Sequence, residues 1–346
     1  MKTVLLLIAL VLGGCADAPR LETLHGKTMG TTWSVKYRRP PAVDADRLAL
    51  DLQRELDTVV AQMSTWQVDS DLTRFNRAPA QTWQTLPAGF YAVLEHALRL
   101  ARETGGAYDP TVGPLVDLWG FGPVRREREP PSDAAIAAAR ARVGWQRIRL
   151  DPAGRRAWQP GGVQLDLSSI AKGFGVDQVA RRLDAAGVSS YLVEVGGELR
   201  GRGRRPDGAP WQVAIERPGA APGAVQRLDE VERVLSLEDR ALATSGDYRH
   251  AFEDHGTVYS HHIDPRSGRP VAHRLASVTV AAREAIDADP LGTTMMVLGP
   301  EAGMAYAVEH RLAVLLIVRT DEGFEERVSP AFAALLGSAA RPGDAP

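Results

Sequence analysis

The segment 165–175, LDLSSIAKGFG, combines a carboxylate, small residues and a lysine in the pattern of an anion-binding site. A strand-like run ends at Asp166, and apolar residues with helical spacing begin at Val176. The first N–H groups of a helix and its dipole attract phosphate. Lys172 can neutralise phosphate charge, and Asp166 can direct a ligand group or a metal. An ordinary corner between a strand and a helix explains the same glycines, so the segment alone leaves both interpretations open.

Two further segments carry groups suited to metal binding and to proton transfer. Asp289 and Thr293 stand four residues apart, so on a helix that begins at Asp289 their oxygens share one face. Such hard oxygen ligands suit Mg²⁺, and the chain has no cysteine or histidine cluster with zinc spacing. The same aspartate, followed by Pro290, is equally suited to capping that helix. His261 is a candidate general base, with a structural hydrogen bond to a loop carbonyl as the alternative.

Seven segments are rich in small, polar or aromatic residues where plain core or plain loop is expected. They are 25–33, 63–76, 107–116, 193–199, 244–249, 260–265 and 287–294. In order and spacing they resemble the ApbE-type FAD:protein FMN transferases from about Gly26 to Leu335. The resemblance implies an α+β fold, a two-lobed single catalytic domain with FAD in the cleft. It also implies Mg²⁺ as cofactor and a serine or threonine hydroxyl of a partner flavoprotein that attacks the FAD pyrophosphate. FMN then becomes attached through a phosphoester, and AMP leaves.

The resemblance also assigns metal ligands to individual residues. It implies that the Asp289 carboxylate, the Thr293 hydroxyl and the backbone carbonyl of Ser169 bind the metal. Some family members carry a second aspartate where Gly292 stands. Only the backbone carbonyl of Gly292 is left to serve there, which makes the metal site less anionic.

The remaining site residues are implied in the same way. His261 matches the family histidine two residues before the isoleucine of Ile-Asp-Pro, whereas His262 stands where an aliphatic residue is usual. Trp66 and Phe75 are expected to anchor their loop rather than to stack on the flavin. The implied FAD contacts are Met29, Ala107, Tyr108, Asp109, Asp166, Lys172 and Ile263.

Two other functions stay open at the level of sequence. Water in place of the acceptor hydroxyl would make the protein a Mg²⁺-dependent FAD pyrophosphatase that produces FMN and AMP. A protein that binds FAD without converting it is the second alternative. Nucleic acid is excluded as the main partner, because the formal net charge is −2.

Apolar periodicity predicts the elements that position these residues. Their alternation lacks the regular rhythm of a doubly wound sheet, so we expect a mixed α+β fold. Helices are predicted over 46–63, 87–104, 132–143 and 176–187, and strands over 32–37, 191–195, 211–216, 276–282 and 313–318.

The N-terminus has the composition of a bacterial lipoprotein signal. A short apolar run over 4–12 is followed by Leu-Gly-Gly-Cys, which resembles a lipobox whose Cys15 is lipidated. A cleaved secretory signal with an incidental cysteine is the alternative. We expect a membrane-anchored protein facing the periplasm, whose acceptors are flavoprotein subunits of membrane redox complexes. The expected divisions are a signal peptide (1–14), a lipidated cysteine and tether (15–25), a flavin transferase domain (26–336) and a disordered tail (337–346).

Overall fold

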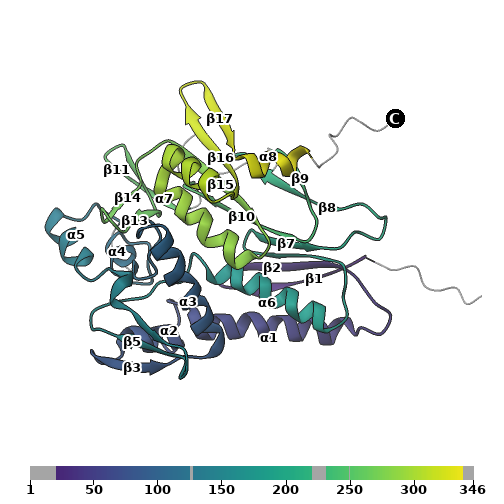
Figure 1. Cartoon of the computed structure of the whole chain (residues 1–346), viewed down its shortest axis with the longest axis horizontal. Coiled ribbons are helices and arrows are strands. Elements are labelled where there is room, and N and C mark those ends of the chain that lie inside the picture. Colours follow the sequence, from purple (N-terminus) through teal and green to yellow (C-terminus); the bar gives the residue numbers. More distant parts are fainter. Residues whose placement is uncertain (1–20, 125–127, 220–230, 249, 338–346) are drawn as a thin grey trace, which may run out of the picture.

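The centre of the molecule is an antiparallel sheet of eight strands (Figure 1). The structure is a computed structural model that describes residues 21–124, 128–219, 231–248 and 250–337. The paired strands of this sheet are antiparallel throughout these residues. In spatial order they are β1 (Leu21–Thr28), β2 (Thr31–Arg38), β6 (Tyr191–Val195), β7 (Glu198–Arg202), β10 (Arg240–Gly246), β15 (Leu275–Ala282), β16 (Ala313–Thr320) and β17 (Gly323–Val328).

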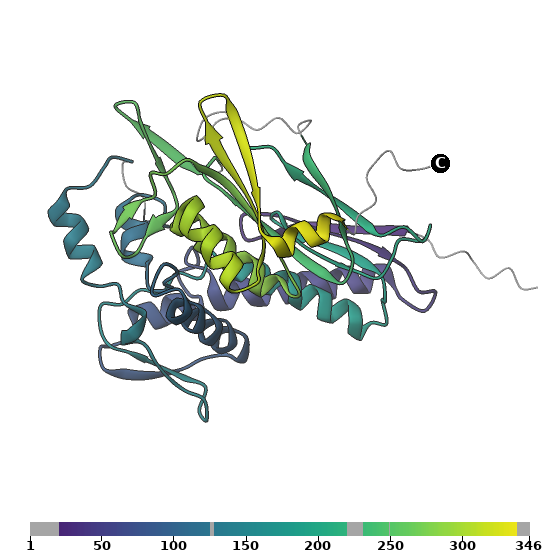
Figure 2. The ribbon, with the colours of Figure 1, turned by 45° about the horizontal axis from the view of Figure 1, so that its top comes forward.

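Three long helices cover one face of this sheet (Figures 1 and 2). They are α1 (Ala45–Met63), α6 (Ala171–Ala185) and α7 (Ala285–Glu309). Alternation along β16 shows why two layers form. Val314 and Leu316 pack in the cluster that contains residues of α7, whereas Leu315 packs with Phe332 of α8 (Pro330–Gly337) on the opposite face.

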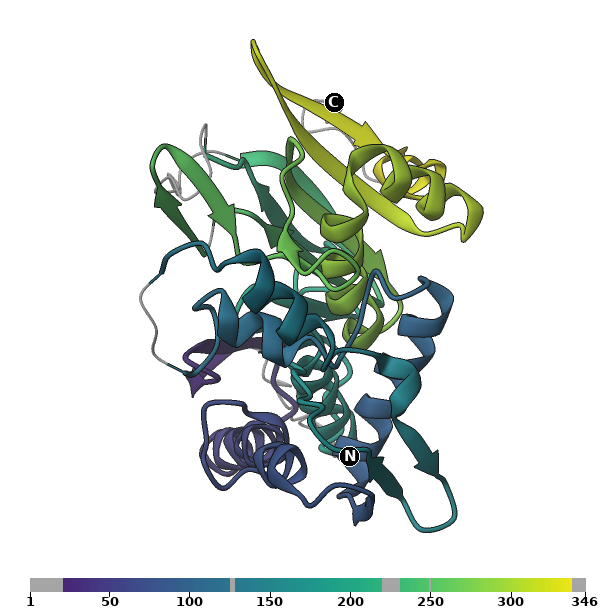
Figure 3. The same cartoon turned by 90° about the vertical axis from the view of Figure 1, so that its left-hand side faces the viewer.

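Smaller elements complete the fold beside the sheet. A second core joins α2 (Asp71–Arg77) and α3 (Ala88–Glu103) to the ends of α1 and α6. The side that faces the viewer in Figure 3 carries α4 (Gly113–Leu118), α5 (Asp133–Arg140) and two hairpins, which share an apolar cluster. The hairpins are β11 (Ala251–Asp254) with β12 (Thr257–Ser260) and β13 (Ile263–Asp264) with β14 (Arg269–Pro270); the other small elements are β3 (Thr82–Thr85), β4 (Arg149–Asp151), β5 (Arg156–Gln159), η1 (Trp145–Arg147), β8 (Trp211–Glu216) and β9 (Val231–Leu237).

The mixed α+β class and most long elements agree with the sequence prediction, but several details need correction. No strand precedes the glycine-lysine segment, because residues 163–170 contain only an isolated bridge, and α6 begins at Ala171 rather than at Val176. The strand β1 was not predicted. Residues 21–25 belong to it and pair with β2, so they are part of the folded domain and not of a tether. The helix capped by Ser132 ends at Arg140.

The helix α7 differs most from its prediction. It begins at Ala285, so Asp289 lies inside it instead of capping it, and Pro290 is also internal. The helical geometry is interrupted at Gly299, whose φ of 79° is followed by a proline without an N–H group. In the portion of the chain that the structure describes, none of the helices has the length and apolarity needed to cross a bilayer.

The residues around this interruption satisfy the hydrogen bond that the proline cannot make. An N–H at position 300 would normally donate to the carbonyl of Met296, four residues earlier. Instead Nε2 of His273 lies 2.7 Å from that carbonyl oxygen and donates to it. A methyl group on Gly299 would approach the His273 ring to 2.8 Å, which leaves no room for a side chain. His273 therefore caps the first half of α7.

Candidate functional site

The first turns of α6 and α7 hold each other in place through two carboxylates. Asp177 of α6 accepts hydrogen bonds from the backbone N–H groups of Ala285 (3.1 Å) and Ile286 (2.9 Å) at the start of α7. In the other direction, Asp289 of α7 accepts a hydrogen bond from the backbone N–H of Gly173 at the start of α6 (2.8 Å). Each carboxylate satisfies N–H groups that have no partner within their own helix.

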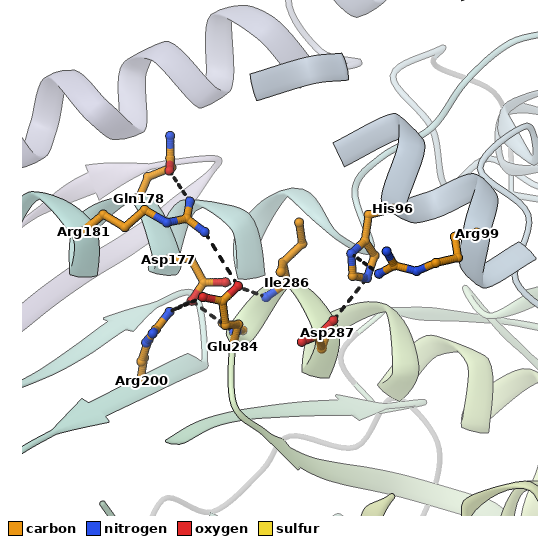
Figure 4. A network of polar contacts seen from close by, with 10 residues as sticks. His96, Arg99, Asp177, Gln178, Arg181, Arg200, Glu284, Ile286 and Asp287 are labelled. Atoms are coloured by element: carbon orange, nitrogen blue, oxygen red, sulfur yellow. Dashed lines mark hydrogen bonds and ion pairs between the residues drawn. The ribbon is translucent and has the colours of Figure 1, made fainter. Parts of the chain in front are cut away.

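The Asp177 end of this arrangement is a buried polar network (Figure 4). Asp177 is fully buried and pairs with the guanidinium of Arg200 on β7, which also lies 3.7 Å from Glu284. Burial raises the pKa of Asp177, and the hydrogen bonds from α7 and the Arg200 charge oppose that increase. The network fixes where α7 begins, and hence where Asp289 stands one turn later.

At the Asp289 end, one lysine lies between two buried carboxylates. Nζ of Lys172 forms an ion pair with Oε1 of Glu198, the first residue of β7, and lies 3.9 Å from Oδ1 of Asp289. The side chains of Glu198 and Asp289 are 2% and 4% exposed, against 30% for Lys172. Lys172, which the sequence assigns to FAD, therefore lies beside Asp289, which the sequence assigns to the metal.

Two glycines allow the backbone to come close at this point. A side chain on Gly173 would meet the carbonyl of Ala285 at 2.2 Å, so its absence lets the starts of α6 and α7 touch. Gly196, in the turn between β6 and β7, has a φ of +58°, and a Cβ there would lie 3.3 Å from Cδ of Lys172. The lysine stem crosses this turn on its way to Glu198.

The residues assigned to the metal surround this helix junction. Ser169 lies in the loop just before α6, and its hydroxyl is 3.3 Å from the phenol oxygen of Tyr108. Thr293 follows Asp289 by one turn of α7 and is partly exposed. Gly292 backs onto β10, since a Cβ at this position would meet Oγ of Ser245 at 2.7 Å.

A magnesium ion suits this set of donors. Within the described residues, no three or more histidine, cysteine, aspartate or glutamate side chains are grouped so that they could hold a metal ion. A cation at Asp289 would therefore depend on hydroxyl, carbonyl, water and substrate oxygens for its other ligands. That is the usual composition of Mg²⁺ sites, which combine one or two carboxylates with waters and phosphate.

The residues assigned to FAD come from four segments, which contain Met29, residues 107–109, residues 166–172 and Ile263. Met29 occupies the tight turn between β1 and β2 with a φ of +49°, and its Cε lies against Gly175 of α6. The backbone N–H of Asp166 donates to the carbonyl of Pro110 (2.8 Å), which ties the loop before α6 to the segment 107–110. Ala107, Tyr108 and Asp109 of that segment are each less than 10% exposed.

The buried groups of segment 107–110 are held in fixed positions. Burial raises the pKa of the Tyr108 hydroxyl, which keeps it a neutral hydrogen-bonding group. Burial also raises the pKa of Asp109, although Thr111 and the backbone N–H of Trp145 donate to its carboxylate. Asp109 and Trp145 line a surface pocket of about 400 Å³ that also contains Arg140 and Arg266.

His261 is oriented by a backbone carbonyl. Its Nδ1 lies 2.9 Å from the carbonyl oxygen of His250, so Nδ1 must carry the proton and Nε2 is the basic nitrogen. Ile263, the remaining residue assigned to FAD, follows at the start of β13 and is 6% exposed. His262 is also buried, and its pKa is lowered well below the ordinary value by burial and then by the neighbouring His261. His262 is therefore neutral near neutral pH.

The histidines connect to α7 through the end of β10. The backbone of Gly246 lies beside the His262 ring, and the preceding residue, Ser245, packs against Gly292 of α7. The segments that contain Ser245, His262 and Gly292, which are separate in the sequence, thus meet along one end of the sheet. The turn of Met29, the segment 107–110 and the turn of Gly196 meet around the start of α6.

Comparison with known proteins identifies the family to which this chain belongs. The model of the ApbE family matches residues 29–316. The chain belongs to the ApbE family. The Haemophilus influenzae protein named FAD:protein FMN transferase is 43% identical over 331 residues, with 94% of each chain covered. The Vibrio cholerae protein of the same name is 43% identical over 324 residues, with 93% of this chain and 95% of the relative covered.

Solved ApbE structures share the fold. The apo form of Pseudomonas stutzeri flavinyl transferase ApbE has a TM-score of 0.85 at 40% identity, covering 93% of this chain and 98% of that one. The flavin transferase ApbE of Vibrio cholerae has a TM-score of 0.83 at 42% identity, covering 91% and 100%. The predicted family and the mixed α+β single domain are thus confirmed.

The sequence prediction missed two buried acids, Glu198 and Asp177, and misjudged Trp66. Glu198 lies in the polar segment 193–199, but nothing in the sequence pairs it with Lys172. Asp177 carried no signal beyond its place on a helix. Phe75 is an anchor, at 1% exposed, whereas Trp66 is 68% exposed and anchors nothing.

Proposed function

We propose that this protein is a Mg²⁺-dependent FAD:protein FMN transferase, which attaches FMN to a serine or threonine hydroxyl of a partner flavoprotein. The supporting observation is the junction of α6 and α7. There the Asp289 carboxylate accepts a hydrogen bond from the Gly173 N–H and lies 3.9 Å from the Lys172 ammonium. The Gly173 N–H at the start of α6 is occupied by Asp289, so the support lies in the lysine and the oxygen-ligand set, which together suit a substrate with a charged pyrophosphate. Relatives that match nearly the whole chain carry the name of this activity.

In the proposed reaction the acceptor hydroxyl oxygen attacks the phosphorus on the FMN side of the FAD pyrophosphate. A new P–O bond forms to that phosphorus, its bond to the bridging oxygen breaks, and AMP leaves with the bridging oxygen. Nε2 of His261 takes the proton from the hydroxyl, and the His250 carbonyl holds the imidazole in the required tautomer. The substrate flavin is proposed to contact Met29, Ala107, Tyr108, Asp109, Asp166, Lys172 and Ile263.

The Mg²⁺ is proposed to bind Asp289 and Thr293 together with the carbonyls of Ser169 and Gly292. When bound, it would offset the negative charge that develops on the phosphate oxygens. The chain's own contribution is to hold Asp289 in place, since one of its oxygens is already fixed by the Gly173 N–H.

We also propose that the mature protein is a lipoprotein anchored through Cys15 and facing the periplasm. The support is the Leu-Gly-Gly-Cys sequence at the end of an apolar run. The signal peptide 1–14, Cys15 and the tail from residue 338 lie outside the described residues. Flavoprotein subunits of membrane redox complexes are the proposed acceptors, because an anchored enzyme meets membrane-bound partners.

The test combines purified protein with FAD, Mg²⁺ and a candidate acceptor domain, followed by mass spectrometry of the acceptor and quantification of nucleotides. The proposal predicts one AMP for each FMN attached and little free FMN, because a positioned hydroxyl outcompetes water. Alanine at the acceptor's hydroxyl residue should stop attachment. Free FMN formed at the same rate with and without every acceptor would identify a pyrophosphatase. Bound FAD that is never converted would identify a carrier.

A further inference from the structure

We propose that Lys172 is a built-in counter-cation of Asp289, which competes with the divalent metal ion for that carboxylate, and that Glu198 draws the ammonium away. This inference rests on the magnesium site of the proposed function. It concerns the regulation of metal loading rather than the transfer reaction, and it assigns a role to Glu198.

The first support is the sharing of one ammonium by two buried acids. Asp289 and Glu198 are both nearly inaccessible to water, and a buried carboxylate requires compensating charge. Lys172 is paired closely with Glu198 and stands at 3.9 Å from Asp289, at the outer limit of an ion pair. The three groups carry a formal charge of −1, which a divalent cation at Asp289 would reverse.

The second support is the position from which the lysine reaches both acids. Lys172 is the second residue of α6, and the next residue, Gly173, donates its N–H to Oδ2 of Asp289. The other oxygen, Oδ1, is the one nearest the ammonium. The carboxylate oxygen left available for a metal is thus the one that faces Lys172.

The third support is the path of the lysine stem. Its Cδ lies against Gly196, where the lack of a side chain leaves space for it in the turn that leads to Glu198. The turn and the acid at its end form a resting place for the ammonium. A metal ion arriving at Asp289 repels the ammonium, and the Glu198 carboxylate offers it a partner at no loss of charge pairing.

The test is calorimetric titration of the FAD-free protein with MgCl₂, so that no catalytic turnover is needed. Lys172→Met should bind Mg²⁺ at least about tenfold more tightly than wild type, since a like charge next to the ion is gone. Glu198→Gln should bind it several-fold more weakly, because the charge that draws the ammonium away from Asp289 is then lost. Lys172→Arg keeps the charge and should bind like wild type or more weakly. Lys36→Met, at an exposed position on β2, is the control for loss of one positive charge.

The outcomes separate this inference from the proposed function. If Asp289→Asn abolishes binding while Lys172→Met binds no more tightly than wild type, the lysine does not compete and only this inference fails. If Asp289→Asn binds as well as wild type, or no variant binds Mg²⁺ even with FAD present, the metal site is misplaced and both fail. Should Lys172→Met not fold, a Glu198→Gln protein with unchanged affinity would overturn the inference.

Discussion

Asp177 and Asp289 stand on different helices, and each accepts hydrogen bonds from the first turn of the helix that carries the other. The pair makes the starts of α6 and α7 a single unit. The residues assigned to phosphate and to metal lie on the two halves of that unit, so their spacing is set by these two carboxylates and by the glycine contact between the helices.

Asp177→Asn should destabilise the protein by about 3 kcal/mol, the usual cost of breaking a buried ion pair. The amide keeps one acceptor for the α7 N–H groups but leaves the charge of Arg200 without its closest partner. Urea unfolding measures the change. Asp321→Asn removes an exposed pair with Arg274 and should cost less than about 1 kcal/mol. Equal effects of the two substitutions would contradict the structural role of Asp177.

Asp289→Asn should remove magnesium-dependent activity. The amide oxygen can still accept the hydrogen bond from Gly173, so the helix junction is retained while the ligand charge is lost. The loss should exceed the roughly 10–100-fold that an outer-shell residue costs, and FAD affinity should change much less. Asp287→Asn on the same helix is the control. Full transferase activity of Asp289→Asn, measured over a range of MgCl₂ concentrations, would exclude this aspartate as the ligand.

His261→Ala should reduce turnover by roughly 10²–10⁴-fold, the range for general base catalysis, with FAD affinity nearly unchanged. The wild-type rate should fall as acidification protonates the imidazole, and the variant should lack this decrease. His255→Asn, in the exposed β11–β12 turn with a φ of +46°, is a control that tolerates the left-handed backbone. A variant that retains both the rate and its acid decrease would transfer the role of base to another group.

His96 should make the protein acid-sensitive. Burial, and next the charge of Arg99, lowers the pKa of His96 to about 4, so at neutral pH it meets Asp287 as a neutral ring (Figure 4). An unfolded histidine binds its proton near pH 6.5, so the unfolded state takes up the extra proton between these values. Stability is therefore complete above about pH 6.5 and decreases as pH falls toward 4. His96→Gln should show a smaller loss of melting temperature over this interval, whereas His25→Gln should follow wild type.

Cys15→Ala should release the protein from membranes or block its maturation. A single thiol at the end of the apolar run is the proposed attachment point, and the substitution removes the only sulfhydryl in the chain. Fractionation and mass spectrometry of the mature N-terminus measure the result. Wild-type protein recovered without acyl chains from the soluble periplasm would argue against the lipoprotein assignment.

Sequence periodicity located the long elements because α1, α3 and strand β16 bury clear apolar faces. It failed where tertiary contacts decide the structure. The start of α6 could not be read from spacing, since Asp289, which lies 116 residues away, accepts the hydrogen bond of the Gly173 N–H in its first turn. The strand β1 was missed because every second side chain is exposed and most of the others are only partly buried, so no clear apolar face marks it.

The candidate site divides in the same way. Asp289, Thr293 and His261 were assigned because their residue types and spacing suit magnesium and proton transfer, and these assignments stay predictions. The Lys172–Glu198 pair was not found, because nothing in the chain links a lysine in one segment to an acid 26 residues later. Trp66 was misjudged since an aromatic residue in a polar loop reads equally well as an anchor and as an exposed ring.

The His273 contact with Met296 has a consequence for how sequences of this kind can diverge. Because His273 donates to the Met296 carbonyl, the stretch that carries Asp289 and Thr293 ends before Gly299 with that carbonyl satisfied. Insertions or repacking beyond Pro300, including changes in the hairpin of β16 and β17, should therefore disturb the turn of Asp289 less than changes before Gly299. The 25-residue helix is in this respect two shorter helices joined at Gly299, with the side chain of a residue from outside the helix standing at the join.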